Sequence, residues 1–300
     1  MKNKRNGYFI LILSVLSIFK FTAFAEEKEK YTIDVKFENN IGMTKYMEVE
    51  SIVKSNQKII SNSGKIYEDA VIYSKLLLQY SIEILSIDED GLPLNCKVIF
   101  EKSSYSEDSN EATTMYFVLN KPYYLKRIKN KNILFYNTEE ITSPIVKNIV
   151  PLISKSLNLK IDTISNICVG ESRQIENEYV NENMLKKYKI LSKESSISLL
   201  SIDKNQKSNL QNFLIRKTNK FKSIDKLNKI SNNSVHFDFE EIFDITIERD
   251  SKIKLETKQL RTETQKSEGV FPEYSKSESL VYEDICKYET TVKYNLGKTK

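Results

Sequence analysis

The sequence predicts a mostly β protein: a β-rich α+β fold whose long antiparallel, curved sheets form two loosely related halves with a connecting helix. Apolar and polar residues alternate on both sides of an acidic turn within Gln79–Glu101. A looser copy of this strand–turn–strand pattern recurs at Asp244–Lys258. Between the two, from Ser143 onward, the apolar residues change to helical spacing. We therefore expect a signal peptide (1–25), an N-terminal β-rich half (26–142), a helical segment (143–165) and a C-terminal β-rich half (166–300).

The hairpin at Gln79–Glu101 is the clearest local prediction. Its apolar faces would consist of Tyr80, Ile82 and Ile84 in the first strand and Leu94, Cys96, Val98 and Phe100 in the second. Asp-Gly flanked by such alternation is typical of a tight turn, and Gly91 can supply the positive φ that the turn needs. The acidic turn Asp88–Gly91 also raises the alternative of bound calcium. An EF-hand-like loop starting at Ser86 would need an oxygen ligand where Lys97 stands, so a solvated turn is favoured.

Met1–Ala25 has the layout of a secretory signal peptide. A basic start precedes the apolar run Tyr8–Phe19, and Ala23 and Ala25 form the small-x-small site of a signal peptidase. The run is shorter than the roughly 20 residues that span a bilayer, so cleavage is favoured over retention as an anchor. No cysteine lies near the site, which disfavours a lipid-anchored lipoprotein. We expect an exported protein, periplasmic or extracellular, with no stable membrane anchor after cleavage.

Removal of this segment changes the charge balance. It has no acidic residue and four of the 46 basic ones, namely Lys2, Lys4, Arg5 and Lys20. The remaining 275 of the 300 residues therefore contain 42 basic and 41 acidic residues, a net charge of +1. A nucleic-acid-binding protein usually carries a marked basic surface, so this class is excluded.

The N-terminal half reads as a series of strands. Tyr67–Leu78 fits either a strand or a short helix, and the strand is favoured. The polar stretch Ser103–Asn110 is expected to be a loop. The other expected elements are strands at Tyr31–Phe37 and Met47–Val53, a turn at Ser61–Gly64, a strand at Thr114–Val118, and a hairpin of Tyr123–Arg127 with Ile133–Tyr136.

Ser143 and Pro144 form a typical helix start, and Pro151 should kink the helix or split it in two. Packing of its apolar face on the sheet is favoured over binding to a membrane surface, because it has few basic residues. After Asn166 strands resume, with a polar stretch at Ser172–Tyr179. The remaining expectations are a strand pair, Tyr188–Leu191 and Ile197–Ile202, around a turn at Lys193–Ser195; a helix and loop within Asp203–Ser234; strands at Phe237–Ile247, Ile253–Arg261 and Val281–Tyr294; and a loop at Ser267–Ser279.

Three cysteines, Cys96, Cys168 and Cys286, are an odd number for an oxidising compartment. They form no CxxC motif, which disfavours a zinc site, and we expect neither a metal nor a cofactor. At most one disulfide can form within the chain, and the sequence does not fix its pairing. Burial of the cysteines as small apolar residues is favoured.

The chain resembles a family of uncharacterised exported bacterial domains that pair two similar halves of long antiparallel strands. The second half of such domains often begins with an apolar-Gly-acidic-x-Trp motif. Val169–Ser172 fits this opening, although Arg173 stands at the Trp position, and Phe243–Leu255 matches the late strand–turn–strand. The resemblance spans most of Tyr31–Tyr294. By analogy of fold it extends to curved half-barrel sheets that carry lipoproteins or lipids across the periplasm, although fold alone does not fix function.

The sequence contains few candidates for catalysis. His236 is the only histidine, so any Ser–His–carboxylate site would depend on it, and a structural or surface role is favoured. No GxSxG, HExxH, phosphate-loop or GxGxxG motif occurs, and we expect no enzyme. Glu240 and Glu241 should point to opposite faces of a strand. Glu241 shares the parity of Phe239 and Phe243, which indicates a partly buried acid at a β-bulge, favoured, or at a ligand site.

Tyrosine is abundant, with 17 residues and no tryptophan in the chain. Tyrosines on a curved sheet can line a cavity for an apolar ligand, although ordinary packing is the favoured explanation. Those on inferred strand faces are Tyr80, Tyr116, Tyr282, Tyr288 and Tyr294. We expect a non-enzymatic envelope protein that binds an apolar ligand, such as a lipid, or a lipidated partner. The alternative is a structural or assembly factor that contacts another envelope protein through its strand edges.

Overall fold

The structure is a computed structural model of the chain. It describes residues 28–34, 40–89, 91, 93–108, 111–116, 119–127, 134–136, 163–177, 185–186, 188–204, 211–225, 235–250, 254–270, 274–275 and 279–296. The first strands are β1 (Lys30–Ile33), β2 (Thr44–Ser61), β3 (Ile66–Ile87), β4 (Pro93–Glu107), β5 (Thr113–Thr114), β6 (Pro122–Arg127) and β7 (Leu134–Tyr136). The later ones are β8 (Ile164–Cys168), β9 (Ser172–Gln174), β10 (Tyr188–Lys204), β11 (Gln211–Asp225), β12 (Val235–Glu248), β13 (Lys254–Val270) and β14 (Ser279–Leu296).

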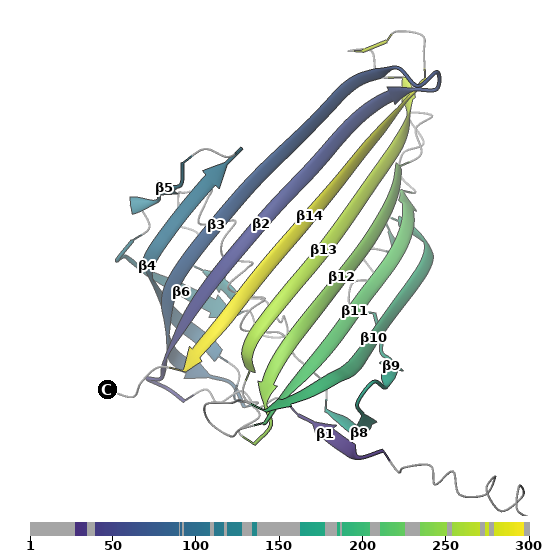
Figure 1. Cartoon of the computed structure of the whole chain (residues 1–300). Coiled ribbons are helices and arrows are strands. Elements are labelled where there is room, and N and C mark those ends of the chain that lie inside the picture. The colour runs from purple at the N-terminus through teal and green to yellow at the C-terminus, as the bar shows by residue number, and fades with distance from the viewer. Residues whose placement is uncertain are drawn as a thin grey trace, which may run out of the picture.

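Twelve of these strands form one large antiparallel sheet, which is not closed (Figure 1). Its order is β7-β6-β4-β3-β2-β14-β13-β12-β11-β10-β9, with β5 beside β4. Strands β1 and β8 form a separate two-stranded sheet at the lower end in Figure 1. The prediction of a mostly β protein built from long antiparallel strands is confirmed.

The first and last long strands of the sheet are neighbours. β2 pairs with β14 along almost its whole length, from Lys45 opposite Leu296 to Ser61 opposite Leu280. Strands β2–β7 and β9–β14 are therefore hydrogen-bonded into one continuous sheet. The upper end of this sheet in Figure 1 is the turn from β2 to β3.

Several predicted elements are confirmed. The Tyr67–Leu78 segment is strand, within β3, and the turn at Ser61–Gly64 separates β2 from β3. The central hairpin is formed by β3 and β4, and Gly91 adopts a φ of 75° and donates its N–H to the carbonyl of Asp88 at 3.1 Å. β6 pairs with β7, as the predicted second hairpin requires.

Two predictions in the C-terminal half are wrong. β10 runs without a turn through Lys193–Ser195, where three polar residues in succession resemble a turn. Lys193 and Glu194 are exposed near the edge of the sheet, while Ser195 is buried. The segment predicted as a helix and loop, Asp203–Ser234, contains the fifteen-residue strand β11. Its alternation is hidden because polar residues occupy several buried positions.

Other corrections concern strand ends. β4 continues through Glu107 and β13 through Val270, into segments predicted as loops, because their polar residues pair with neighbouring long strands. Of the described residues in the strand predicted at Thr114–Val118, only Thr114 is in a strand, β5. The polar stretch after Gly170 contains the short strand β9, Ser172–Gln174.

The predicted connecting helix lies almost entirely outside the described residues. Only the end of the 143–165 segment is described, and there Ile164 and Ser165 already belong to β8. In the described part of the chain, no helix is long and apolar enough to cross a membrane.

The large sheet has two different faces. We call the face that carries the apolar core the inner face, and the opposite one the outer face. A row of cross-strand partners near the lower end, here the lower row, is at most 7% exposed throughout. It consists of Leu199, Ile215, Ile245, Thr257, Val292, Val49 and Leu78, one residue from each strand between β10 and β3.

Two apolar clusters build on this row. One lies over β2–β4 and β6 and includes Tyr80 and Phe100, whose ring centroids are 5.7 Å apart. The other lies over β10–β12, where Ile33 of β1 and Ile167 of β8 pack against it. The small sheet therefore covers the lower end of the inner face on the β10–β12 side. Burial of this apolar surface is the main stabilising contribution to the fold.

Candidate site: a polar belt on the inner face

Two rows above the lower row, five polar residues form a continuous line across five strands. This polar belt consists of Ser195, Asn219, Glu241, Arg261 and Tyr288, each the register partner of the next. Ser195 is 2% exposed, and Asn219 and Glu241 are fully buried. Burial of a polar group costs free energy unless the group is hydrogen-bonded, because it loses its hydration.

The belt residues and the core residues share one face because side chains alternate between the two faces along each strand. In β12, Glu241 lies between Phe239 and Phe243 on the inner face, and in β11 Asn219 precedes Phe221. The predicted burial of Glu241 is confirmed, but the favoured β-bulge is wrong. The pairing of β12 with both neighbours stays in register through Glu241. Glu240 points to the outer face, where its carboxylate is 2.7 Å from Lys220 Nζ.

Hydrogen bonds link the belt to the rows beside it. Ser195 Oγ donates to Asn219 Oδ1 at 2.8 Å, and Gln259 Nε2 donates to Glu241 Oε1. Arg261 Nη2 donates to Glu263 Oε1, while the hydroxyl of Tyr288 donates to Glu263 Oε2 at 3.4 Å. The belt therefore contains an acid that accepts from an amide and an arginine paired with a second acid.

Arg261 lies close to two aromatic rings. Its Cζ is 5.2 Å from the ring centroids of both Phe239 and Tyr288. Burial alone would lower the pKa of Arg261, but the hydrogen bond and charge of Glu263 outweigh it and raise the pKa. Burial also raises the pKa of the Tyr288 hydroxyl and of the Cys286 thiol. The arginine is thus charged and the phenol protonated across the physiological pH range.

An aromatic patch lies directly above the belt on β11 and β12. The ring centroid of Phe221 is 4.8 Å from that of Phe239, in a stacked pair, and 5.8 Å from that of Phe237. Phe221 and Phe239 are at most 5% exposed, whereas Phe237 is half-buried. The inner face therefore changes from polar to aromatic within one row.

Two buried donors of the belt lack an acceptor among the described residues. They are Asn219 Nδ2 and Arg261 Nε, on the two residues that flank Glu241 in the row. A buried donor without an acceptor costs about 1–3 kcal/mol. The fold retains this cost twice in one row, and an acceptor supplied there would remove it.

A second unusual group lies at the lower end of the inner face. Lys254, at the start of β13, is 7% exposed, and its Nζ is 5.1 Å from the ring centroid of Tyr294. Burial, assisted by the charge of Lys45, lowers the pKa of Lys254 to about 7. Burial also raises the pKa of Tyr294 to about 12. Both groups lie beside the core, and the pKa of Lys254 makes stability pH-dependent.

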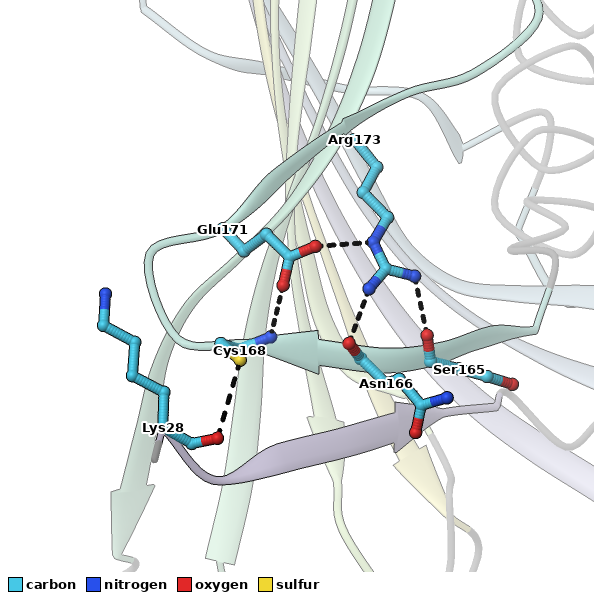
Figure 2. Close-up of polar contacts among 6 residues, drawn as sticks. All are labelled: Lys28, Ser165, Asn166, Cys168, Glu171 and Arg173. Atoms are coloured by element: carbon cyan, nitrogen blue, oxygen red, sulfur yellow. Dashed lines mark hydrogen bonds and ion pairs between the residues drawn. The ribbon is translucent and has the colours of Figure 1, made fainter. Parts of the chain in front are cut away.

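The motif at Val169–Ser172, together with Arg173, forms a hydrogen-bonded cluster between β8 and β9 (Figure 2). Arg173, at the Trp position of the motif, donates to the carboxylate of Glu171 at 2.8 Å and to two carbonyls of β8, at Ser165 and Asn166. Glu171 also accepts the N–H of Cys168 at 2.9 Å, and Arg173 lowers the pKa of Glu171. Gly170 makes the turn possible with a φ of 82°. This cluster fixes β8, and with it β1, against the large sheet.

Several other predicted site residues lie apart from the belt. His236 is exposed on the outer face of β12, between Ile224 and Lys266 in the register. Asp88 of the acidic turn is 2.6 Å from Arg127 Nη1, and no cluster of metal-ligating side chains occurs in the described part of the chain. The signal-peptidase residues Ala23 and Ala25 lie outside the described residues.

The cysteines and tyrosines are divided between core and inner face. All three cysteines are free, with Cys96 buried in the core and Cys168 and Cys286 half-buried. Tyr80 is a core residue, Tyr288 belongs to the belt, and Tyr116 is 77% exposed outside any strand.

Sequence reasoning identified Glu241 and Tyr288 but missed Ser195, Asn219 and Arg261. A usable signal was present, since Lys217 and Asn219 share the parity of Phe213, Ile215 and Phe221. A long strand with this parity would have placed both on the inner face.

Comparisons with known proteins assign no family. No family model and no curated protein matches the chain. Similar solved structures include a lipovitellin structure concerned with lipid–protein interactions, at 10% identity and a TM-score of 0.41, covering 88% of this chain and 26% of that one. An outer membrane channel from Pseudomonas putida F1 has 8% identity and a TM-score of 0.21, covering 88% of this chain and 100% of that one. A mutant porin from Rh. blastica has 7% identity and a TM-score of 0.15, covering 83% and 100%. This chain spans about a quarter of the lipovitellin chain, and TM-scores this low assign no function.

Proposed function

We propose that the protein is an exported, non-enzymatic binding protein of the bacterial envelope or its surroundings, which holds an amphipathic molecule or a lipidated partner on the inner face of its sheet. The observation that carries this proposal is the difference between the two faces. The inner face has a buried polar belt beside an aromatic patch, whereas the outer face is covered by ion pairs.

The outer face has the character of a solvated surface. Its charged residues pair across neighbouring strands at distances of 2.6–3.3 Å, and most of them are substantially exposed. The pairs are Lys58–Asp69, Lys75–Glu50, Lys97–Glu83, Arg216–Asp244, Lys220–Glu240, Lys222–Asp238, Lys266–Glu283 and Lys293–Glu48. An apolar ligand would gain little on such a surface, so its binding is expected on the inner face.

The inner face offers the two kinds of contact that an amphipathic molecule needs. Phe221, Phe237 and Phe239 suit an apolar chain, and Asn219 and Arg261 suit a polar group. Ligand sites of this type combine an apolar lining with a few well-placed polar groups. Export is inferred from the layout of Met1–Ala25, and the non-enzymatic character from the lack of a known catalytic motif in the sequence.

Native mass spectrometry of the protein, purified gently from its own host, tests the proposal. We expect extra mass that organic extraction removes and that proves to be an amphipathic lipid. The unliganded mass alone, at protein concentrations where a lipid added back also fails to bind, would contradict the proposal.

A second function, assembly through strand edges, is favoured by the upper part of β3. The β3–β4 ladder ends where Asp108 accepts the N–H of Tyr73 and donates its own N–H to the Tyr73 carbonyl. Above this point β3 pairs only with β2 among the described strands, and Ile66, Val71 and Ile72 are 55%, 56% and 41% exposed. Apolar edges of this kind accept strands from other chains.

A Val71→Pro variant tests this second function, because proline removes a backbone donor from the edge. A protein partner that co-purifies with the wild type should be lost from the variant. If the variant retained such a partner, binding at the β3 edge would be contradicted.

A further inference from the structure

We propose that the polar belt receives the head group of an amphiphile, and that this head group carries no net charge and offers several hydrogen-bond acceptors. The inference rests on the proposed binding function and specifies the class of ligand. Monoacylglycerol-like and zwitterionic lysolipid-like molecules belong to this class, whereas fatty acids and cationic amphiphiles do not.

The charge balance of the belt supports a head group without net charge. On β11–β14, the charged side chains on the inner face in the belt and in the rows on either side are Lys217, Arg261, Glu241 and Glu263. The four buried or half-buried ones cancel. Lys193, in the row above the belt on β10, is exposed at the sheet edge. A ligand charge placed here would have no countercharge in a partly dehydrated site, which is costly.

The donors of the belt support a head group rich in acceptors. Asn219 is fully buried, its Oδ1 is occupied by Ser195, and its Nδ2 has no acceptor among the described residues. Arg261 uses Nη2 for Glu263, but its Nε is buried without an acceptor. Carbonyl, ether or hydroxyl oxygens of a head group would satisfy both donors, with Glu241 between them able to accept from a hydroxyl.

The aromatic patch supports an attached apolar chain and its direction. Phe221 and Phe239 lie in the row directly above the belt, and Phe237 lies one row higher. A chain that starts at the belt would therefore extend along β11 and β12 toward the upper end of the sheet. The lower row, in contrast, has no buried donor without an acceptor among the described residues, and the small sheet covers it over β10–β12.

The test compares amphiphiles of equal chain length that differ only in head group. The exported protein, freed of lipid, is titrated below the critical micelle concentration with a monoacylglycerol, a lysophosphatidylcholine, a fatty acid and an alkyl-trimethylammonium salt. Isothermal titration calorimetry should show that the monoacylglycerol and the lysophosphatidylcholine bind at least about tenfold more tightly than the fatty acid and the alkyl-trimethylammonium salt. One lost or unpaired hydrogen bond changes the affinity by about tenfold.

Two variants connect this preference to the belt. Asn219→Leu keeps the side-chain size, removes one donor and should weaken monoacylglycerol binding about tenfold while leaving the far-ultraviolet circular dichroism unchanged. Arg216→Met, on the outer face, is the matched control and should bind as the wild type does.

The outcomes separate the inference from the proposed function. Binding of the fatty acid or the cationic amphiphile as tightly as the monoacylglycerol would overturn the head-group inference but leave amphiphile binding intact. Unchanged binding by a folded Asn219→Leu protein would also overturn the inference. No binding of any of the four probes would overturn the proposed function as well.

Discussion

The lower row and the polar belt lie on the same face of the same strands, yet they have opposite compositions. In β12 the lower row has Ile245, and two rows higher the belt has Glu241; in β11 the corresponding residues are Ile215 and Asn219. All four are fully buried. Equal burial with opposite chemistry means that the two rows contribute differently to stability. The apolar row stabilises the fold, whereas the belt costs stability, which we attribute to the proposed binding.

The largest expected effect comes from breaking the lower row. Ile245→Ala removes buried apolar contacts within the β10–β12 cluster and should lower the free energy of unfolding by about 3 kcal/mol. Urea denaturation followed by circular dichroism measures this change. A loss below about 1 kcal/mol would show that the row is not the main stabilising element.

The next effect concerns Lys254, a buried lysine at the lower end of the inner face. Its pKa of about 7 lies below the ordinary lysine value, so the unfolded chain binds more protons between these two values. Stability should therefore rise with pH above 7, by about 2 kcal/mol between pH 7 and 9 for this group.

The variant Lys254→Met isolates this effect. The wild type should approach the stability of the variant as the pH rises from 7 to 9. The difference in the free energy of unfolding between the wild type and Lys254→Met is measured, so that other titrating groups cancel. Cys96 is one such group: burial raises its pKa to about 12, so its contribution to stability falls as the pH rises through the alkaline range. A pH-independent difference between the two proteins would contradict the buried, neutral state of Lys254.

A substitution in the belt should affect ligand binding more than stability, whereas a substitution in the lower row should affect mainly stability. Arg261→Met removes the partner of Glu263 and the stacking on Phe239, but it also relieves a buried donor without an acceptor. We expect a loss in the free energy of unfolding of about 1–2 kcal/mol, because Glu263 loses its countercharge while one buried donor is relieved, and a weakening of amphiphile binding of about tenfold. Unfolding and calorimetric titration on the same sample test both. A large loss of stability with unaltered binding would make Arg261 a structural residue.

The smallest effect is expected on the outer face. Arg216 makes two hydrogen bonds of 2.7 Å to the carboxylate of Asp244, but its side chain is 44% exposed. Arg216→Met should therefore cost at most about 1 kcal/mol, and less at high salt. Thermal unfolding at two salt concentrations measures this, and no change in ligand binding is expected.

The sequence predicts those parts of the fold in which alternation is apolar against polar. Tyr80, Ile82 and Ile84 mark their strand unambiguously, and so do the phenylalanines of β12. In β11 the inner face carries Lys217 and Asn219, so the same period exists without a hydrophobic signal. In β10, polar residues on both faces at the sheet edge look like a turn.

The candidate site could be predicted only in part, for a related reason. The parity of Glu241 identified a buried acid, but its meaning depends on its cross-strand partners Asn219 and Arg261, 22 and 20 residues away in the chain. Register between long strands is set by the whole pairing and is not readable from one segment. The pairing of β2 with β14 was equally beyond a local reading.

The most direct test of the belt as a binding site is to map where an amphiphile sits. A monoacylglycerol with a photoreactive diazirine in its acyl chain is bound, irradiated and located by peptide mass spectrometry. We predict labelling of β11 and β12 around Phe221, Phe237 and Phe239, with loss of the label in Asn219→Leu. Labelling confined to the outer face or to the lower row, or labelling unchanged in that variant, would contradict the account.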